Sequence, residues 1–265
     1  MEKDSRWRSL VPGRRGFVRG LVAYGSVVGL LLAAPFIGAW ADRHGVPQAI
    51  VGVGIVSVLA VVSGAIGLRM LPSFRRARAI ATRAEGSGLS FTARPHVPLG
   101  WDRLPSFSAP DQMHRLANMV SGRDDSGEVI VVDDEVEYVT DLNAPSEWRT
   151  CTFARIPAMV PAITIRPRRL VSGGHEGIGT EWGAFDRRWV VLSRDRKAAV
   201  TIVDPALMSF LMELDRPATF ELGGCWCMLS VARDGAERVL ENVELVRAFV
   251  AHLPRIVPSL YPNVR

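Results

Sequence analysis

Two long apolar runs near the start of the chain constrain it more than any other feature. Residues 20–41 contain no charged side chain, and neither do residues 46–68. At a rise of about 1.5 Å per residue, a helix of either length would cross a hydrocarbon layer about 30 Å thick. Backbone inside lipid must satisfy its own hydrogen bonds, so both runs should be helical. The sequence predicts an N-terminal transmembrane α-hairpin over residues 17–71, with helices at about 18–41 and 46–69.

The distribution of basic residues predicts an orientation for this hairpin. The leader, residues 1–16, is rich in arginine, whereas the turn between the runs has only Arg43. A second basic cluster follows the hairpin and consists of Arg75, Arg76, Arg78 and Arg83. Under the positive-inside rule both termini face the cytoplasm, which predicts a multi-pass protein of the cell (inner) membrane. The cluster is expected to fix topology, and the alternative is contact with anionic lipid.

Small residues recur at four-residue spacing in both runs. Gly25, Gly29 and Ala33 lie in the first run, and Ala60 and Gly64 lie in the second. Such spacing lets helix backbones approach closely, so the two helices should pack together, with a homodimer through the same stripe as the alternative. The formal charge of +5 belongs to the flanks of the runs, because acidic side chains outnumber basic ones after residue 103. No basic face for nucleic acid is indicated.

After the hairpin the chain changes character twice. Residues 72–110 read as a basic juxtamembrane segment and a linker rich in Gly, Ser and Pro. Residues 111–265 read as a cytoplasmic α+β domain, mostly antiparallel sheet with two or three helices. The strands expected here have two-residue alternation and cover 128–132, 136–140, 148–156, 185–193, 219–222 and 225–231. Tight hairpins are predicted at Asp133-Asp134-Glu135 and at Gly223-Gly224.

Two helices are predicted within this domain. Asp204-Pro205 supplies an N-cap and a proline at the first helical position. The last helix is amphipathic, begins near Asp234 and Glu237, and ends at Pro254. Its apolar stripe consists of Val239, Val243, Val246, Val250 and Leu253.

Several short motifs, together with the hairpin, carry a resemblance. They are Leu104-Pro105-Ser106-Phe107, Arg155-Ile156-Pro157-Ala158, Ile163-Thr164-Ile165-Arg166-Pro167, Phe185-Asp186-Arg187-Arg188-Trp189, the stretch 198–211 and Leu253-Pro254. With these motifs the chain resembles a family of uncharacterised two-span membrane proteins from high-GC Gram-positive bacteria. The resemblance implies architecture and location only, since the family has no assigned activity, ligand or catalytic residue.

The cysteines offer a weak case for a metal site. Cys225 and Cys227 are two residues apart, so they share one face of a predicted strand. Cys151 and His175 are further side chains of the kinds that bind metal ions. The C-x-C spacing differs from the usual C-x-x-C of zinc sites, and a disulfide is not expected in a reducing compartment. Small buried thiols are the favoured interpretation, with metal binding or redox chemistry as the alternative. No metal ligand and no cofactor is predicted.

The segment from Gly173 to Gly179 is the other candidate. Its glycines superficially suggest a phosphate loop, but the lysine of a P-loop is missing. His175-Glu176 has no second histidine one helical turn on, so a metalloprotease helix is not indicated. Acidic clusters at Asp124-Asp125 and Asp133–Glu135 are interpreted as turns. No Gly-x-Ser-x-Gly elbow is present, so no catalytic residue is predicted and enzyme activity stays open.

These observations favour a membrane-tethered cytoplasmic interaction or regulatory module with an unknown protein partner. The alternative is a small-ligand sensor or an enzyme that uses the Gly173–Gly179 loop or the Cys225/Cys227 face. The stretch from Trp182 to Trp189 is the predicted partner surface, because tryptophan and arginine often anchor interfaces. Arg187 and Arg188 are its predicted charged contacts, although burial statistics favour the interpretation that both tryptophans are core residues.

Overall fold

The computed structural model describes residues 33–40, 42–45, 47–124, 127–139, 145–168, 177–233 and 235–263. The chain divides into two compact units, residues 10–76 and residues 77–265, the latter together with residues 1–9. Helix α2 (Gln48–Gly86) runs from the first unit into the second. Each unit is described by itself below.

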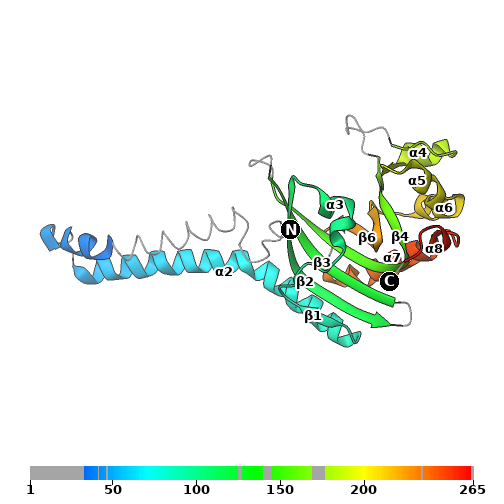
Figure 1. The fold of residues 1–265 in the computed structure, drawn as a ribbon. Helices are drawn as coiled ribbons and strands as arrows, with labels where there is room; N and C mark the ends of the chain where they lie inside the picture. Colours follow the sequence, from blue (N-terminus) through cyan, green and yellow to red (C-terminus); the bar gives the residue numbers. More distant parts are fainter. Residues whose placement is uncertain are drawn as a thin grey trace, which may run out of the picture. The chain divides into compact units, whose positions relative to one another are not determined.

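The second unit contains one antiparallel sheet with short helices around it (Figure 1). Its strands are β1 (Ser90–Thr92), β2 (Gln112–Asp124), β3 (Gly127–Tyr138), β4 (Glu147–Pro167), β5 (Trp189–Ser193) and β6 (Thr219–Ala232). Its helical segments are the 3₁₀ turn η1 (Trp101–Arg103), α3 (Pro105–Ser108), α4 (Gly183–Arg188), α5 (Arg196–Ile202), α6 (Pro205–Glu213), the 3₁₀ turn η2 (Ala236–Arg238), α7 (Val239–Ala251) and α8 (Val257–Leu260).

Strand β4 organises the sheet. The strands follow the order β1-β2-β3-β4-β5, and β6 also pairs with β4. Its first half lies between β3 and β6, and its second half lies between β5 and β6. The register between β4 and β6 shifts between Arg155 and Ile163, so the long strand is irregular where its partners change.

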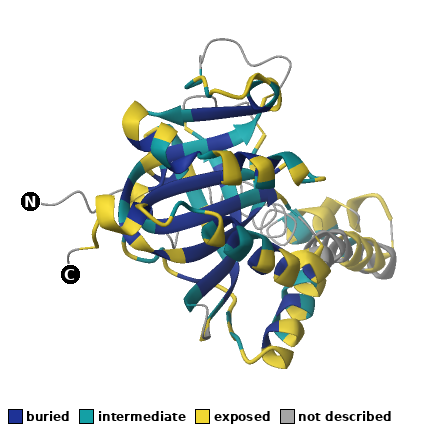
Figure 2. Cartoon of the chain, turned by 90° about the vertical axis from the view of Figure 1, so that its right-hand side faces the viewer, coloured by how far each residue is buried: buried dark blue, intermediate teal, exposed yellow. Residues whose placement is uncertain are grey.

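The sheet buries both of its faces, and Figure 2 shows the buried residues concentrated in its strands. On one face, η1 and α3 place Trp101, Leu104 and Phe107 over β3, β4 and β6. On the opposite face, α5, α6 and α7 cover β4, β5 and β6. The end of α2 joins that second face through Ile80 and Ala84. Alternate residues of β3 and β6 therefore belong to different cores.

The predicted transmembrane hairpin is corrected by the structure. Within the described residues, none of the helices combines the length and the apolar character that crossing a membrane requires. Most of the first run, residues 18–41, lies outside the described residues. The second run is no separate helix, because α2 continues past residue 69 through the arginine cluster to Gly86.

Three predictions that depended on the transmembrane hairpin are therefore wrong as well. They are the multi-pass inner-membrane location, the cytoplasmic assignment of both termini and the transmembrane fold class. The antiparallel sheet with helices that was expected after residue 110 is present. Among the α2 side chains that the structure describes, the valines at positions 53, 56, 58 and 61 are exposed.

The acidic triplet Asp133-Asp134-Glu135 is not a hairpin turn. It lies inside β3, where Asp133 and Asp134 are almost fully buried. Asn118 and Thr150 donate hydrogen bonds to Asp133, and Arg233 forms an ion pair with it at 3.5 Å. Asp134 faces the other side of the sheet and is bound by His114 and Arg149. Paired charges can occupy a strand interior, so the turn prediction was wrong.

Gly223-Gly224 is not a hairpin either, because β6 runs through it without a turn. A Cβ atom on Gly223 would lie 2.3 Å from the carbonyl oxygen of Arg103, so η1 approaches the strand too closely for a side chain. Gly224 has φ 59° and pairs with Val160 at the register shift. Glycine inside a strand marks a close approach and a bulge here.

Both predicted helices are present. Asp204 accepts a hydrogen bond from the backbone N–H of Leu207 at 2.9 Å and caps α6, which confirms the Asp204-Pro205 start. In α7, Val239, Val243 and Val246 are buried as predicted. The strand predicted over 185–193 was half wrong, since residues 183–188 form α4 and the strand begins at Trp189.

Candidate functional site

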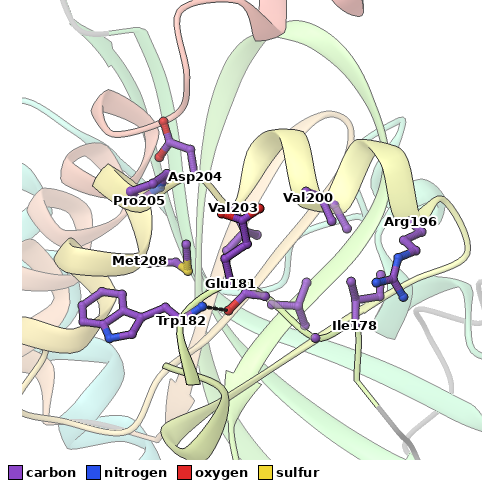
Figure 3. Close-up of a pocket in the computed structure, with 13 residues that line it drawn as sticks. Ile178, Glu181, Trp182, Arg196, Val200, Val203, Asp204, Pro205 and Met208 are labelled. Atoms are coloured by element: carbon purple, nitrogen blue, oxygen red, sulfur yellow. Dashed lines mark hydrogen bonds between the residues drawn. The ribbon is translucent and has the colours of Figure 1, made fainter. Parts of the chain in front are cut away.

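A groove beside β5 is the candidate binding site. It has a volume of about 690 Å³, within the range of about 300–1,000 Å³ that is usual for small-molecule sites. One wall is the extended segment 178–182, and the other is α5 with the start of α6 (Figure 3). The lining residues are Ile178, Gly179, Thr180, Glu181, Trp182, Val191, Arg196, Ala199, Val200, Val203, Asp204, Pro205 and Met208.

The wall formed by segment 178–182 is held by specific bonds. The N–H of Ile178 donates to the carbonyl of Val191 in β5 at 2.8 Å. The N–H of Thr180 donates to both oxygens of Asp186 at 3.2 and 3.0 Å, and its hydroxyl donates to Oδ1 at 2.9 Å. Asp186, on α4, therefore fixes the wall without lining the groove.

The groove has an apolar interior and charged margins. Val191, Ala199, Val203 and Met208 line it and are buried in the fold. Trp182 is 36% exposed and Val200 is 50% exposed, so both lie where a ligand can reach them. Figure 3 places Trp182 and Asp204 toward one end and Arg196 and Ile178 toward the other, with the Glu181 side chain between them beside Val203.

A second cluster of polar groups lies under α3. His114 contacts Asp134 through Nδ1 at 2.9 Å and the backbone oxygen of Ser106 through Nε2 at 3.1 Å. Arg149 donates from Nε to the same Asp134 oxygen at 2.9 Å. Its Nη2 also lies 2.8 Å from that oxygen and forms the ion pair. Burial opposes the charge of Arg149, but nearby acidic groups, including Asp134 and Glu221, leave its pKa above the usual value.

Glu221 closes this cluster from β6. Its Oε2 accepts hydrogen bonds from both the N–H and the hydroxyl of Ser106, each at 2.9 Å. Burial raises the pKa of this carboxyl above the ordinary range, and the Ser106 N–H and Arg149 partly oppose that rise. The carboxylate thus satisfies the start of α3, where backbone N–H groups have no helical partner.

The arrangement of this cluster is structural. The Ser106 hydroxyl donates to Glu221, and the ring of His114 contacts the Ser106 carbonyl instead of its hydroxyl. A hydroxyl activated by histidine would need a bond between those two groups. The described residues therefore show no catalytic site here, and the cluster ties the η1–α3 segment to the sheet.

The cysteines do not form one face. Cys227 is buried in the core beneath α7, whereas Cys225 is partly buried and packs against the core beneath η1. Burial raises the pKa of Cys151 to about 12 and raises that of Cys227 as well. Among the described residues, no group of three or more His, Cys, Asp or Glu side chains could hold a metal ion.

Other candidate residues are placed as follows. Of the Gly173–Gly179 loop, only residues 177–179 are described, and Ile178 and Gly179 line the groove. His175 lies outside the described residues. The arginines at 75, 76, 78 and 83 all lie on α2, and contact of this cluster with anionic lipid stays a prediction.

The predicted partner surface from Trp182 to Trp189 is divided. Trp189 is a core residue, and Trp182 lies at the groove. Arg188 donates to the carbonyl of Met212 at 2.6 Å and to that of Leu214, so it caps the end of α6. Arg187 remains exposed.

The groove residues of α5 were missed because no helix was predicted there. A signal was present, since Asp195 precedes Arg196, Lys197 and two alanines, which is typical of an N-cap before a helix. In the structure, Asp195 accepts a hydrogen bond from the N–H of Ala198 at 2.9 Å. Thr180 and Asp186, whose hydrogen bonds hold segment 178–182, are marked by no comparable sequence pattern.

Residues 77–265 form an α+β unit with a buried polar cluster under α3 and an open groove beside β5. No protein-family model matches the chain, and no curated protein matches it. The chain is similar to the crystal structure of the mycobacterial trehalose monomycolate transport factor A, TtfA, with 14% identity and a TM-score of 0.46. The match covers 72% of this chain and 98% of that chain. A likeness of this strength says nothing about function.

Proposed function

We propose that this protein is a binding module that holds a small molecule with an apolar body in the groove between segment 178–182 and helices α5 and α6. The observation that carries the proposal is the groove itself, about 690 Å³ in volume and lined mainly by apolar side chains. Pockets of this size and lining, with a few polar groups at the margin, are characteristic of small-molecule sites.

The construction of the groove supports the same proposal. Segment 178–182 has no helix or strand of its own, yet Asp186 and β5 hold it by five hydrogen bonds. A wall fixed in this way is largely formed before a ligand arrives, so little ordering free energy is lost on binding. The partly exposed Trp182 and Val200 supply apolar surface that a ligand would remove from water.

The test fills the groove and measures uptake of a neutral apolar probe, 1-octanol, by calorimetry on the full chain. Val200→Trp places a large side chain in the groove at an exposed position, which the fold should tolerate. Ile256→Trp is the matched control, because Ile256 is 53% exposed and lies outside the groove. The exposed valines of α2 can also bind the probe, so the comparison between these two variants is the readout.

If the groove is the binding site, Val200→Trp should lose the binding of 1-octanol in the groove, and Ile256→Trp should retain it. Gly179→Leu narrows the groove from the opposite wall and should give the same loss, because a Cβ atom there meets only Asp186, at 3.9 Å. Equal binding by all three variants and the parent chain would exclude the groove as the site.

A further inference from the structure

The charged margin of the groove is asymmetric. Asp204 lies with Trp182 toward one end and Arg196 lies at the other, and the Glu181 carboxylate lies between them beside Val203 (Figure 3). The side chain of Glu181 is exposed and has no hydrogen bond or ion pair with any residue that the structure describes. Asp204 uses Oδ1 for the α6 cap, and no described residue donates to its Oδ2. Two carboxylates with spare acceptor capacity therefore border the groove, one at the Trp182 end and one beside Val203.

Trp182 gives that end a second recognition element. An indole attracts a cation to its face through the ring quadrupole, and tryptophan does so more strongly than tyrosine or phenylalanine. Its backbone N–H donates to the Thr180 hydroxyl at 3.2 Å, which Asp186 holds in turn. The backbone of Trp182 is thus held by the same bonds that build the groove.

From this juxtaposition we infer that the groove takes an amphiphile whose cationic, ammonium-type group lies between Trp182, Asp204 and the Glu181 carboxylate, and whose apolar body extends along the groove toward Val200 and Ile178. Aromatic faces are the usual recognition element for a quaternary ammonium group, and a carboxylate attracts the same positive charge. Arg196, at the opposite end, disfavours a cation there and so sets the direction of the ligand. This inference rests on the proposed function, since it names the ligand class for the same groove.

The test compares three probes with the same alkyl chain and different head groups. Octyltrimethylammonium is cationic, octanoate is anionic and 1-octanol is neutral. Calorimetry on the full chain should show tighter binding of octyltrimethylammonium than of the other two. Trp182→Leu keeps an apolar side chain but removes the π face, and should weaken the cationic probe about three- to fivefold. Glu181→Gln keeps the shape and should weaken it about two- to fivefold.

Matched variants separate this effect from general charge. Glu213→Gln removes an exposed carboxylate outside the groove and should leave all three affinities unchanged. Arg196→Gln removes the opposite charge at the other end and should weaken octanoate while leaving octyltrimethylammonium as tight or tighter. Retention of 1-octanol by Trp182→Leu and Glu181→Gln would show that the groove itself is intact.

The outcomes distinguish the two proposals. If Val200→Trp removes binding of all three probes equally, and Glu181→Gln behaves like Glu213→Gln, the cationic preference is refuted and the groove remains a binding site. If octanoate binds tightest and depends on Arg196, the inferred direction is refuted. If Val200→Trp binds every probe as Ile256→Trp does, both the groove and the inference fail.

Discussion

Individual side chains in this fold have distinct chemical environments, and the cysteines show it most directly. Cys225 is partly buried beside Arg155, whereas Cys151 and Cys227 are fully buried with raised pKa values. Because the thiolate is the reactive form, iodoacetamide should alkylate Cys225 first in the native protein. Mass spectrometry should find one modified thiol before unfolding and three after it. Cys225→Ser should remove the native-state reaction, and early modification of Cys227 would contradict the assigned burial.

Glu221 predicts a specific pH dependence of stability. Its pKa in the folded protein lies above the ordinary value of 4.5 because burial disfavours the charged form. Between the ordinary and the raised pKa, the folded state binds more protons at this site, so its contribution to stability falls as pH rises. Glu221→Gln keeps an acceptor for Ser106 and should abolish this fall, as measured by urea unfolding upward from pH 4.5. Glu244→Gln, at an exposed glutamate, should keep the parent slope.

Arg187 and Arg188 are neighbours with opposite expected effects. Arg188 donates to two carbonyls at the end of α6, so Arg188→Glu removes these bonds and sets a carboxylate against the negative end of a helix. We expect a loss of about 1–3 kcal/mol in the free energy of unfolding. Arg187→Glu, at an exposed position, should change it by less than about 0.5 kcal/mol. Similar losses from both variants would contradict the capping role. The two arginines therefore cannot be exchanged together as a test of a partner surface.

At the scale of elements, Gly223 decides how closely η1 can lie on β6. A Cβ atom at Gly223 would lie 2.3 Å from the Arg103 carbonyl oxygen, so Gly223→Ala must push η1 away from the strand. We expect a loss of about 1–3 kcal/mol in thermal or urea unfolding, as for other overpacked sites. Gly183→Ala is the control, since its nearest heavy atom would be the flexible end of Arg187 at 3.8 Å. Equal stability of the two variants would mean that η1 can move freely.

The elements show which sequence signals were sufficient. Asp204-Pro205 predicted α6 correctly because capping is a local interaction between neighbours in the chain. Asp133–Glu135 and Gly223-Gly224 were misread as turns because their explanation is distant in sequence. The partners of the acids include His114, Arg149 and Arg233, and the glycine is required by Arg103.

The candidate site was less predictable than the sheet for the same reason. The Gly173–Gly179 loop was singled out for its glycines, and its last two residues do line the groove. The opposite wall comes from α5 and α6, and the wall is held by Asp186, which no local pattern marks. A groove between elements is a property of packing, and sequence periodicity reports only the elements.

At the scale of residues 77–265, the two cores share the same strands. β3, β4 and β6 contribute alternate side chains to the core under η1 and to the core under α7. Opening one core would expose the strands that also form the other core. This unit should therefore unfold in one cooperative transition. Hydrogen exchange of amides in β3 and in β6 should report the same opening free energy. A lower value for one strand would show that the cores separate.

The opposite orientation of Asp133 and Asp134 has a consequence for strand alignment during folding. A slip of β3 by one residue would exchange the two carboxylates between the faces, because side chains alternate along a strand. Because the two acids are adjacent, one of them would take the position and the partners of the other. The remaining carboxylate would lose its own partners, Arg233 and Asn118 or His114 and Arg149, without gaining the other set. The hydrophobic residues of β3 offer no such discrimination, since valine and isoleucine occupy both faces. The adjacent acids thus penalise misaligned pairings, and replacing both with asparagine should raise the misfolded fraction after rapid refolding from urea.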